Sequence, residues 1–397
     1  MREVVVVAAV RTPIGSIGGA LKAVPPEALA QTVIEGALGK VGLEPALLDE
    51  IILGQTKQST DAPNIARVAA LMAKVPEAVP AYTVHRQCAS GLQAILNAVQ
   101  QIQCDYSTVV LAGGVESMST APFYIRNARF GVGNGNTAFL DPNIESQPKS
   151  QPKDIYGSFN MIQTADLVAA QYHVSRAEQD AFALASQQKA VAAIDSQRFA
   201  DEIVPVVLPQ KKGEPLVFAV DEYPKRSTDL EKLAKLKPIF PEGTVTAGNA
   251  SGRNDGAAAL ILMSKEKADE LGLKPLAKVL GAAASGVDPR VMGIGPVPAT
   301  RKLLDKLSMR IEDFGLVEIN EAFAAQTLAC AKELNIAADR LNVNGGAIAL
   351  GHPLGCSGAR IAATLMHEMK KRNEKHGLAT ICIAGGLGMA IAFENIG

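Results

Sequence analysis

The sequence predicts an α/β fold in which helices cover both faces of a mainly parallel sheet. Short apolar runs of strand length alternate with segments of helical periodicity, and this alternation is typical of β–α units. The predicted strands are Val4–Ala9, Glu50–Gly54 and Thr108–Ala112, and the predicted helices are Pro26–Val41, Asn64–Lys74 and Gly91–Gln103. Because 397 residues exceed one ordinary core, two or three domains are expected.

The middle of the chain, about residues 120–246, is interpreted as an insertion that lies over the sheet. Its first part is rich in glycine, proline and polar residues, which indicates loops rather than core. Two helices are predicted next, Asn160–Tyr172 and Arg176–Asp195, and Ser175 with Glu178 forms a capping-box pattern at the start of the second. A further strand is predicted at Ala257–Met263.

The last third of the chain repeats features of the first. A strand is predicted at Phe314–Ile319, a helix at Ala322–Asn335 and another strand at Thr380–Ala384. The Ser-Gly pair at 90–91 recurs at 357–358, and the Gly-Gly pair that follows the strand at 113–114 recurs at 385–386. Together with the β–α pattern, these repeats predict a duplicated α/β unit.

Composition and motifs exclude several classes of protein. The net charge of −1 gives no global field that favours nucleic acid or an anionic membrane. Five cysteines without a Cys-x-x-Cys pair argue against disulfides and a zinc ribbon, and fit a reducing compartment. The apolar run at 4–9 is too short to span a bilayer, and no phosphate-binding P-loop pattern is present. We therefore expect a cytoplasmic protein that binds no nucleic acid, membrane or metal.

Cys88 is the first candidate for a chemical role. It lies between a predicted strand end and the start of a helix, where the helix dipole stabilises a thiolate. Gly91 permits a sharp turn that would expose the sulfur. The alternative interpretation is a small buried cysteine, but its place at a turn favours a nucleophile.

His352 lies in the most glycine-dense stretch of the chain, in which five of the fifteen residues from 344 to 358 are glycine. Such density indicates a tight turn or a close backbone approach, so the imidazole is placed to act at a reactive centre. Cys382 alone resembles a strand residue of the core, yet the glycines after it offer backbone N–H groups for an oxyanion site.

Other polar residues are weaker candidates. Asn320, at a strand-to-helix junction, is placed either to hold a water or an acyl oxygen or simply to cap the helix. Cys104 and Cys330 fall in helical patterns and are interpreted as packing residues. His367 and His376 are interpreted as solvated residues of a polar helix end.

Six motifs in order give the chain a resemblance to the thiolase family, of the acetyl-CoA acetyltransferase or 3-ketoacyl-CoA thiolase type. The resemblance runs from Arg11 to Gly388. The motifs are Cys-Ala-Ser-Gly-Leu-Gln (88–93), Gly-Gly-Val-Glu-Ser-Met-Ser (113–119), Gly-Thr-Val-Thr-Ala-Gly-Asn-Ala-Ser-Gly (243–252), Asn-Glu-Ala-Phe (320–323), Asn-Gly-Gly-Ala-Ile-Ala-Leu-Gly-His-Pro-Leu-Gly (344–355) and the segment around Cys382.

The resemblance implies a duplicated fold of two βαβαβαββ halves, packed as five layers, α-β-α-β-α, with an inserted loop domain. It places the first half at 1–119 plus about 247–270 and the second at about 271–397. The insertion, about 120–246, would carry CoA-binding and oligomer contacts, and a homodimer or homotetramer is expected.

The resemblance also implies the role of each site residue. Cys88 would be acylated, His352 would take its proton, and Cys382 would act as the second acid and base. His352 and a water on Asn320 would form one oxyanion site, and the backbone N–H groups of Cys88 and Ala384 the other. Ser251, Ala247 and Phe323 match positions that line the pantetheine channel, and Met161, Lys225 and Arg226 fall near the family's CoA-contacting segments.

The expected reaction is the condensation of two acetyl-CoA to acetoacetyl-CoA and CoA, or the thiolysis of 3-ketoacyl-CoA. CoA is then a substrate or product, and no cofactor is bound permanently. Longer-chain degradative thiolysis, a catalytically silent CoA- or lipid-binding protein, and a β-ketoacyl synthase relative remain alternatives; Cys382 argues against the synthase. The region 129–153 is long and polar compared with a typical biosynthetic member of the family, which leaves acyl-chain specificity and tetramer contacts open. The chain also departs from the family pattern at four single positions, His85, Asn160, Arg253 and Ala384.

Overall fold

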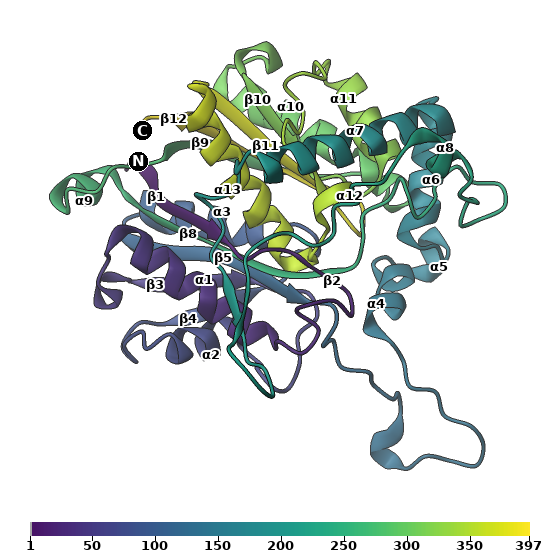
Figure 1. Cartoon of the computed structure of the whole chain (residues 1–397), viewed down its shortest axis with the longest axis horizontal. Helices are drawn as coiled ribbons and strands as arrows, with labels where there is room; N and C mark the ends of the chain where they lie inside the picture. The colour runs from purple at the N-terminus through teal and green to yellow at the C-terminus, as the bar shows by residue number, and fades with distance from the viewer. Residues whose placement is uncertain (1) are drawn as a thin grey trace.

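Two half-sheets of the same topology form the frame of the molecule in the computed structural model, which describes residues 2–397 (Figure 1). The first half-sheet has the strand order β4-β3-β5-β8-β1, and the second has the order β10-β11-β12-β9. The first contains β1 (Val4–Arg11), β3 (Glu50–Gly54), β4 (Ala81–Val84), β5 (Val109–Ser117) and β8 (Asn254–Ser264). The second contains β9 (Ala277–Gly286), β10 (Leu316–Ile319), β11 (His376–Ile383) and β12 (Leu387–Asn395).

Strand directions correspond between the two half-sheets. β3 is parallel to β5, and β10 is parallel to β11. In both half-sheets, each of the next two strands runs antiparallel to the strand before it in the order. A short antiparallel contact of β1 with β9 joins the half-sheets, and the two-residue β2 (Gly15–Ser16) pairs with β8. The duplicated unit is therefore present. The expectation of a mainly parallel sheet is wrong, because β8 and β12 are antiparallel to both of their neighbours. Hydrophobic periodicity predicts strands but not their direction.

Helices complete the five predicted layers. The two middle helices, α3 and α13, lie between the half-sheets and share one apolar core with them (Figure 1). α1 and α2 cover the outer face of the first half-sheet, and α10 and α11 cover the second. The bounds are α1 (Pro26–Val41), α2 (Ile65–Met72), α3 (Ser90–Gln103), α10 (Pro296–Leu307), α11 (Ala324–Glu333) and α13 (Leu354–Arg372).

The crossing of α3 and α13 explains the repeated Ser-Gly pairs. A Cβ on Gly91 would lie 2.8 Å from the carbonyl oxygen of Gly355, and one on Gly358 would lie 2.5 Å from the backbone nitrogen of Leu92. Both glycines therefore allow the middle helices to approach closely. Gly114 serves the same approach. The sequence predicted that this strand ends at Ala112, but β5 continues through Gly113 and Gly114 to Ser117.

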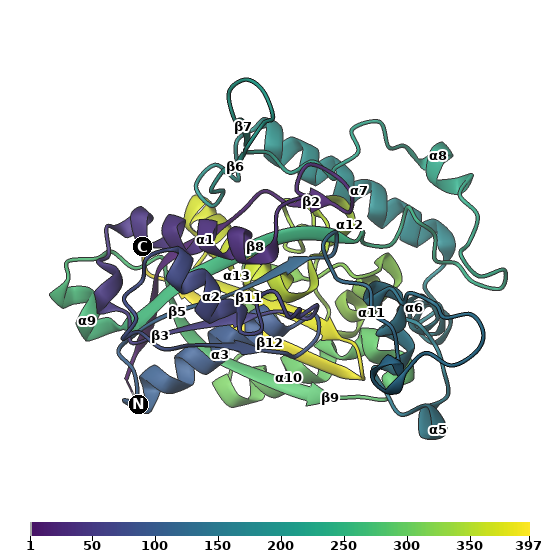
Figure 2. The same ribbon diagram turned by 90° about the horizontal axis from the view of Figure 1, so that it is seen from below.

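The segment between β5 and β8 carries the shorter helices and a hairpin. Figure 2 shows its longest helix, α7, extending along one side of the molecule, and the capping box of Ser175 and Glu178 is present at its start. The other elements are α4 (Pro142–Glu145), α5 (Lys153–Tyr156), α6 (Met161–Gln171), α7 (Arg176–Asp195), β6 (Val206–Leu208), β7 (Leu216–Phe218) and α8 (Leu230–Ala234). The remaining short helices elsewhere are α9 (Lys265–Glu270) and α12 (Ala347–Leu350).

A buried ion cluster fastens this segment to the first half-sheet. The guanidinium of Arg11 on β1 donates to Glu202 at 2.6 Å and to both carboxylate oxygens of Asp221, at 2.7 and 2.9 Å. All three side chains are buried, and Asp221 also accepts from the backbone N–H of Ile14. Because each charge has partners with good geometry, the cluster fixes the position of the inserted segment.

Within residues 2–397, no helix is both long and apolar enough to cross a membrane.

Candidate active site

A sharp turn between β4 and α3 presents Cys88. Gln87 adopts a positive φ of 46°, and the Ser90 hydroxyl accepts from the backbone N–H of Arg86 at 2.8 Å and donates to the carbonyl of Gln87 at 2.7 Å. The turn predicted at Cys88 is therefore present. Its strained residue is Gln87, whereas Gly91 serves helix packing.

His352 lies two residues before α13, as Cys88 lies two residues before α3. Gly351 has φ 103°, and a Cβ there would lie 2.4 Å from the side chain of Asn254. This close approach allows Asn254 Oδ1 to accept from the backbone N–H of His352 at 3.0 Å. The glycine before His352 is therefore required by both its backbone conformation and its contact.

The hydrogen bonds of His352 define its tautomer. Its Nδ1 lies 2.6 Å from Ser357 Oγ, and the Ser357 hydroxyl donates its single proton to the carbonyl of Pro353 at 2.9 Å. Ser357 must therefore accept from His352, which puts the imidazole proton on Nδ1. Nε2 is left with a lone pair, and the amide nitrogen of Asn320 faces it at 3.4 Å.

The electrostatic environment keeps His352 neutral. Burial, with a smaller contribution from the charge of Arg360, lowers the pKa of His352 to about 3. A neutral imidazole with a bare Nε2 is a proton acceptor at physiological pH.

The two predicted catalytic thiols are also strongly perturbed. Burial raises the pKa of Cys88 to about 11, and the backbone N–H groups of Ala384 and Cys88 and the charge of Lys57 oppose part of that rise. Cys382, at the end of β11, is fully buried, and burial followed by the neighbouring Cys88 raises the pKa of its thiol. Both resting cysteines are thiols rather than thiolates, so each needs a base to react.

One cavity of about 330 Å³ brings most of the predicted residues together. Those that line it are Cys88, His352, Cys382, Ala384, Ser251, Ala247, Phe323 and Met161. Asn320 is buried behind His352. No direct hydrogen bond joins Cys88 to His352 among residues 2–397, although both line this cavity and His352 was expected to take the Cys88 proton. His352 Nε2 instead faces Asn320.

Loops from both halves build the wall of this cavity. Ala250 pairs with Phe323 in an antiparallel bridge, and the backbone N–H of Ser251 donates to the carbonyl of Ala322 at 3.0 Å. Ala384 is absent from the residues with positive φ, so its Cβ is tolerated where the family pattern has glycine.

The two predicted basic residues lie outside this cavity. Lys225 lines an adjoining cavity of about 380 Å³, which shares Ala247 and Tyr223 with the first. Arg226 is exposed and forms two hydrogen bonds with Asp195, at 2.9 and 2.7 Å. The structure therefore brings Lys225 near the site but not Arg226. Lys232 lines the adjoining cavity as well and was not among the predicted residues.

Two supporting residues were missed by the sequence analysis. Glu116 on β5 accepts from the backbone N–H groups of Lys57 and Gly355, both at 2.9 Å, and so links the first half to the start of α13. Ser357 was seen only as part of a repeat. Its position in the first turn of α13, four residues after Pro353, would have indicated it, because side chains four residues apart lie on one face of a helix and the Ser357 hydroxyl therefore points back toward Pro353.

Three of the interpretations of minor residues were wrong. Cys104 is exposed at the end of α3 and is not a packing residue, although Cys330 is buried. His367 is buried, and its Nε2 lies 2.8 Å from the carbonyl of Ala9. His376 begins β11 rather than ending a helix, and its ring lies against Phe314.

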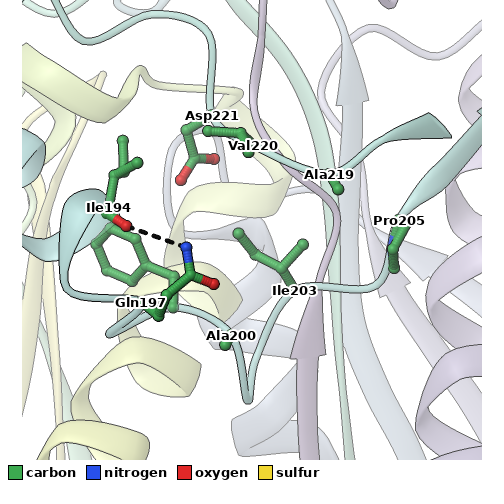
Figure 3. A pocket seen from close by; sticks show the side chains of 9 residues that line it. Ile194, Gln197, Ala200, Ile203, Pro205, Ala219, Val220 and Asp221 are labelled. Carbon is green, nitrogen blue, oxygen red and sulfur yellow. Dashed lines mark hydrogen bonds between the residues drawn. The ribbon is translucent and has the colours of Figure 1, made fainter. Parts of the chain in front are cut away.

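A further cavity, of about 260 Å³, lies beside the buried ion cluster (Figure 3). Its labelled wall is largely apolar, and its carboxylate, Asp221, is engaged by Arg11. None of the predicted site residues lines this cavity, so it lies outside the candidate active site.

Both halves of the duplicated α/β fold contribute to one cavity, which contains two thiols and a neutral imidazole. These groups define a site of the acyl-transfer class. Comparison with known proteins agrees. The family description "Thiolase, N-terminal domain" matches residues 4–266, and "Thiolase, C-terminal domain" matches residues 273–395. The chain belongs to the thiolase family.

Individual relatives extend over the whole chain. An acetyl-CoA acetyltransferase of Chromobacterium violaceum is 51% identical over 394 residues, which cover 99% of this chain and 100% of the relative. The crystal structure of the Bacillus anthracis acetyl-CoA acetyltransferase is 48% identical, with a TM-score of 0.96, and the match covers 100% of this chain and 99% of that one. Human mitochondrial 3-ketoacyl-CoA thiolase in complex with CoA is 42% identical, with a TM-score of 0.94 and coverage of 99% and 98%.

Proposed function

We propose that this chain is an acetyl-CoA C-acyltransferase that works through an acyl-enzyme on Cys88. It would condense two acetyl-CoA to acetoacetyl-CoA and CoA, and catalyse the reverse thiolysis of 3-ketoacyl-CoA. The observation that carries the proposal is the convergence of Cys88, His352 and Cys382 on one cavity. Relatives named acetyl-CoA acetyltransferase, about half identical over the full length, support the same activity.

In the first stage, Cys88 attacks the thioester carbonyl of acetyl-CoA while His352 Nε2 accepts the thiol proton. The new sulfur–carbon bond replaces the bond to CoA, which leaves as the thiol after it takes up the proton of Cys382. Cys382 is then a thiolate, and His352 keeps the proton of Cys88. The bare Nε2 and neutral state of His352 suit it for this transfer. Once protonated, Nε2 becomes a donor and can stabilise the oxyanion.

In the second stage, the Cys382 thiolate removes a proton from the methyl group of a second acetyl-CoA and so becomes a thiol again. The resulting carbanion attacks the acetyl group on Cys88, a carbon–carbon bond forms, and the Cys88 sulfur leaves and regains its proton from His352. The backbone N–H groups of Ala384 and Cys88, which face the Cys88 sulfur, are suited to the oxyanion of the acyl-enzyme. Among residues 2–397, Asn320 Oδ1 is buried without a hydrogen-bond partner, which supports the expected water at the other oxyanion site.

CoA binding is proposed along the two adjoining cavities. Ser251, Ala247, Phe323 and Met161 line the inner cavity, which suits the pantetheine arm. Lys225 and Lys232 line the outer one, where their ammonium groups suit the nucleotide phosphates. Thiol, imidazole and backbone donors supply every step, so we propose no resident cofactor; activity should survive dialysis against a metal chelator.

We also propose a homodimer or homotetramer. Figure 1 shows the segment between β5 and α4 extending away from the two halves. It carries Phe130, which is 96% exposed, and Phe139, which is 74% exposed. Large apolar side chains this exposed favour burial against another subunit. Light scattering of the protein and of a Phe130→Ser, Phe139→Ser variant tests the proposal, which predicts a smaller species for the variant.

The function is tested by assaying thiolysis of acetoacetyl-CoA and of C6–C16 3-ketoacyl-CoA beside condensation of acetyl-CoA. The proposal predicts turnover in both directions and its loss in Cys88→Ala. Full activity in Cys88→Ala would contradict it. Tight CoA binding without turnover would identify a silent CoA-binding protein, and preference for the long substrates would identify a longer-chain degradative thiolase.

A further inference from the structure

A second cavity, distinct from the catalytic one, lies between α7 and α11 and has no part in the reaction proposed above. Its volume is about 510 Å³, whereas that of the catalytic cavity is about 330 Å³. Cavities of roughly 300–1,000 Å³ are the size that holds small organic ligands. In the part of the chain that the structure describes, the two cavities share no lining residue, so a ligand of the second does not compete with the substrates for space.

The wall of the second cavity is mainly apolar, and one face of each helix supplies most of it. The lining residues of α7 are at positions 182, 185, 186 and 189, and those of α11 are at 328, 331 and 332. Side chains at this spacing lie on one face of a helix. The largest apolar side chains of the wall are Phe182, Leu328, Ile336 and Leu341. The wall therefore suits the alkyl chain of a ligand.

Two ammonium groups add positive charge to this wall. Lys189 is half-buried, and its Nζ donates to the carbonyl of Leu341 at 2.9 Å. Lys332 lines the same cavity and is exposed, so it lies where the cavity meets solvent. Across residues 2–397, neither lysine forms an ion pair. Because an ammonium has three protons, Lys189 retains two for a ligand, and an anionic head group would accept them best.

One carboxylate, that of Glu321, is found among the described residues of the wall, and it is already bound within the protein. It accepts from Ser186 Oγ at 2.7 Å, from Asn342 Nδ2 at 2.8 Å and from the backbone N–H of Ile348 at 3.1 Å. Both of its oxygens therefore have donors, and neither lysine is neutralised by contact with it. The wall has two cations against one internally bound anion, which favours a ligand with a negative charge.

Glu321 also connects this cavity to the catalytic residues. It directly follows Asn320 in the chain, and its hydrogen bond to Ile348 holds α12, which ends two residues before His352. The charge of Glu321 opposes the lowering of the Lys189 pKa by burial, so the two groups attract each other. An anion bound to Lys189 would weaken that attraction. Occupation of the cavity would thus loosen a restraint on the segments that carry Asn320 and His352.

We propose that the cavity between α7 and α11 binds a medium-chain fatty acid, with its carboxylate on Lys189 and Lys332 and its alkyl chain against the apolar wall, and that this binding slows thiolysis through Glu321. The binding is noncovalent and is additional to the proposed acyl transfer. Only its effect on the rate of thiolysis rests on that proposed function.

The binding test titrates the full-length protein with octanoate in a calorimeter. Octan-1-ol keeps the alkyl chain but lacks the charge, and acetate keeps the charge but lacks the chain. One octanoate should bind per chain, about 10- to 100-fold more tightly than octan-1-ol, because charge-assisted hydrogen bonds hold its carboxylate. Acetate should bind at least about 100-fold more weakly than octanoate, because it buries little apolar surface.

Variants with matched controls locate the ligand. Lys189→Met should weaken octanoate binding by about 10-fold or more, Lys189→Arg should retain most of it, and Lys332→Met should weaken it less, because Lys332 is exposed. Ala185→Phe should weaken binding by filling part of the cavity. Lys306→Met removes an exposed lysine of α10, and Ala192→Phe adds the same ring at an exposed position of α7 outside the cavity. Both of these controls should bind octanoate as the wild-type protein does.

Competition and kinetics separate this cavity from the catalytic one. Saturating CoA should leave the octanoate affinity unchanged, because CoA is proposed to occupy the other two cavities. Octanoate should lower kcat for the thiolysis of acetoacetyl-CoA and leave KM unchanged. Lys189→Met should remove this inhibition.

The outcomes distinguish the inference from the proposed function. Absence of octanoate binding, binding that CoA abolishes, or binding that Lys189→Met and Ala185→Phe leave unchanged would overturn the site. Binding at the site with an unchanged kcat would overturn the link through Glu321. Because calorimetry needs no turnover, a protein that binds octanoate but lacks thiolase activity would contradict the proposed function and leave the site intact.

Discussion

Removal of the Ser357 hydroxyl should impair catalysis without touching substrate. In Ser357→Ala, the Nδ1–H of His352 loses its acceptor at 2.6 Å, and a buried N–H is left unpartnered. Such a group costs about 1–3 kcal/mol. The imidazole can avoid this cost by moving its proton to Nε2, but that tautomer cannot accept the proton of Cys88.

The expected loss follows from this tautomer penalty. Because each 1.4 kcal/mol corresponds to about a factor of ten, kcat/KM should fall roughly 10- to 100-fold. Thiolysis of acetoacetyl-CoA measures the change. Thr364→Val is the control: Thr364 lies on the same helix and donates to Glu202 at 3.0 Å, away from the cavity, so this variant should lose stability but keep its kcat/KM.

The result that would refute the reasoning is a folded Ser357→Ala protein with wild-type kcat/KM. It would show that the Nδ1 proton needs no acceptor, and that the position of Nε2 is fixed by other contacts of His352.

Three further perturbations test the packing and electrostatics of the site. Arg11→Met should lower the free energy of unfolding in urea by about 3–5 kcal/mol, because Glu202 and Asp221 stay buried without a cation, and a loss below about 1 kcal/mol would contradict this. Gly91→Ala should cost about 1–3 kcal/mol through its clash with Gly355, whereas Gly39→Ala, whose Cβ meets nothing, should be neutral or stabilising; equal effects would contradict the close helix crossing. Alkylation of Cys88 by iodoacetamide should still accelerate with pH well above the usual thiol pKa of about 8.5, because only the thiolate reacts and burial raises the pKa to about 11, and a plateau near 8.5 would disprove that environment.

Local sequence patterns predicted several elements to within a residue. The helices Pro26–Val41 and Arg176–Asp195 have the expected bounds, since proline at the first turn and a capping box mark their starts. Glu50–Gly54 is likewise the strand expected from its apolar run. These signals are contained within a few consecutive residues, and tertiary packing did not override them.

Features that depend on distant partners were not accessible in this way. The charged residues after His367 suggested solvent exposure, yet α13 places His367 on a buried face beneath Ala9. No local signal indicated that Lys57 lines the catalytic cavity, because both halves of the chain build that cavity. The cysteines and His352 were identified through motifs, but no local pattern could indicate that Nε2 of His352 would face Asn320.

The most direct test of the central claim is to identify the acylated residue. The protein is incubated with acetyl-CoA, quenched in acid and digested, and its peptides are examined by mass spectrometry. The account predicts one acetyl group, on Cys88, which remains in a Cys382→Ala variant and is absent from Cys88→Ala. An acetyl group on Cys382 in the wild-type protein, or none on Cys88 under conditions of turnover, would contradict it.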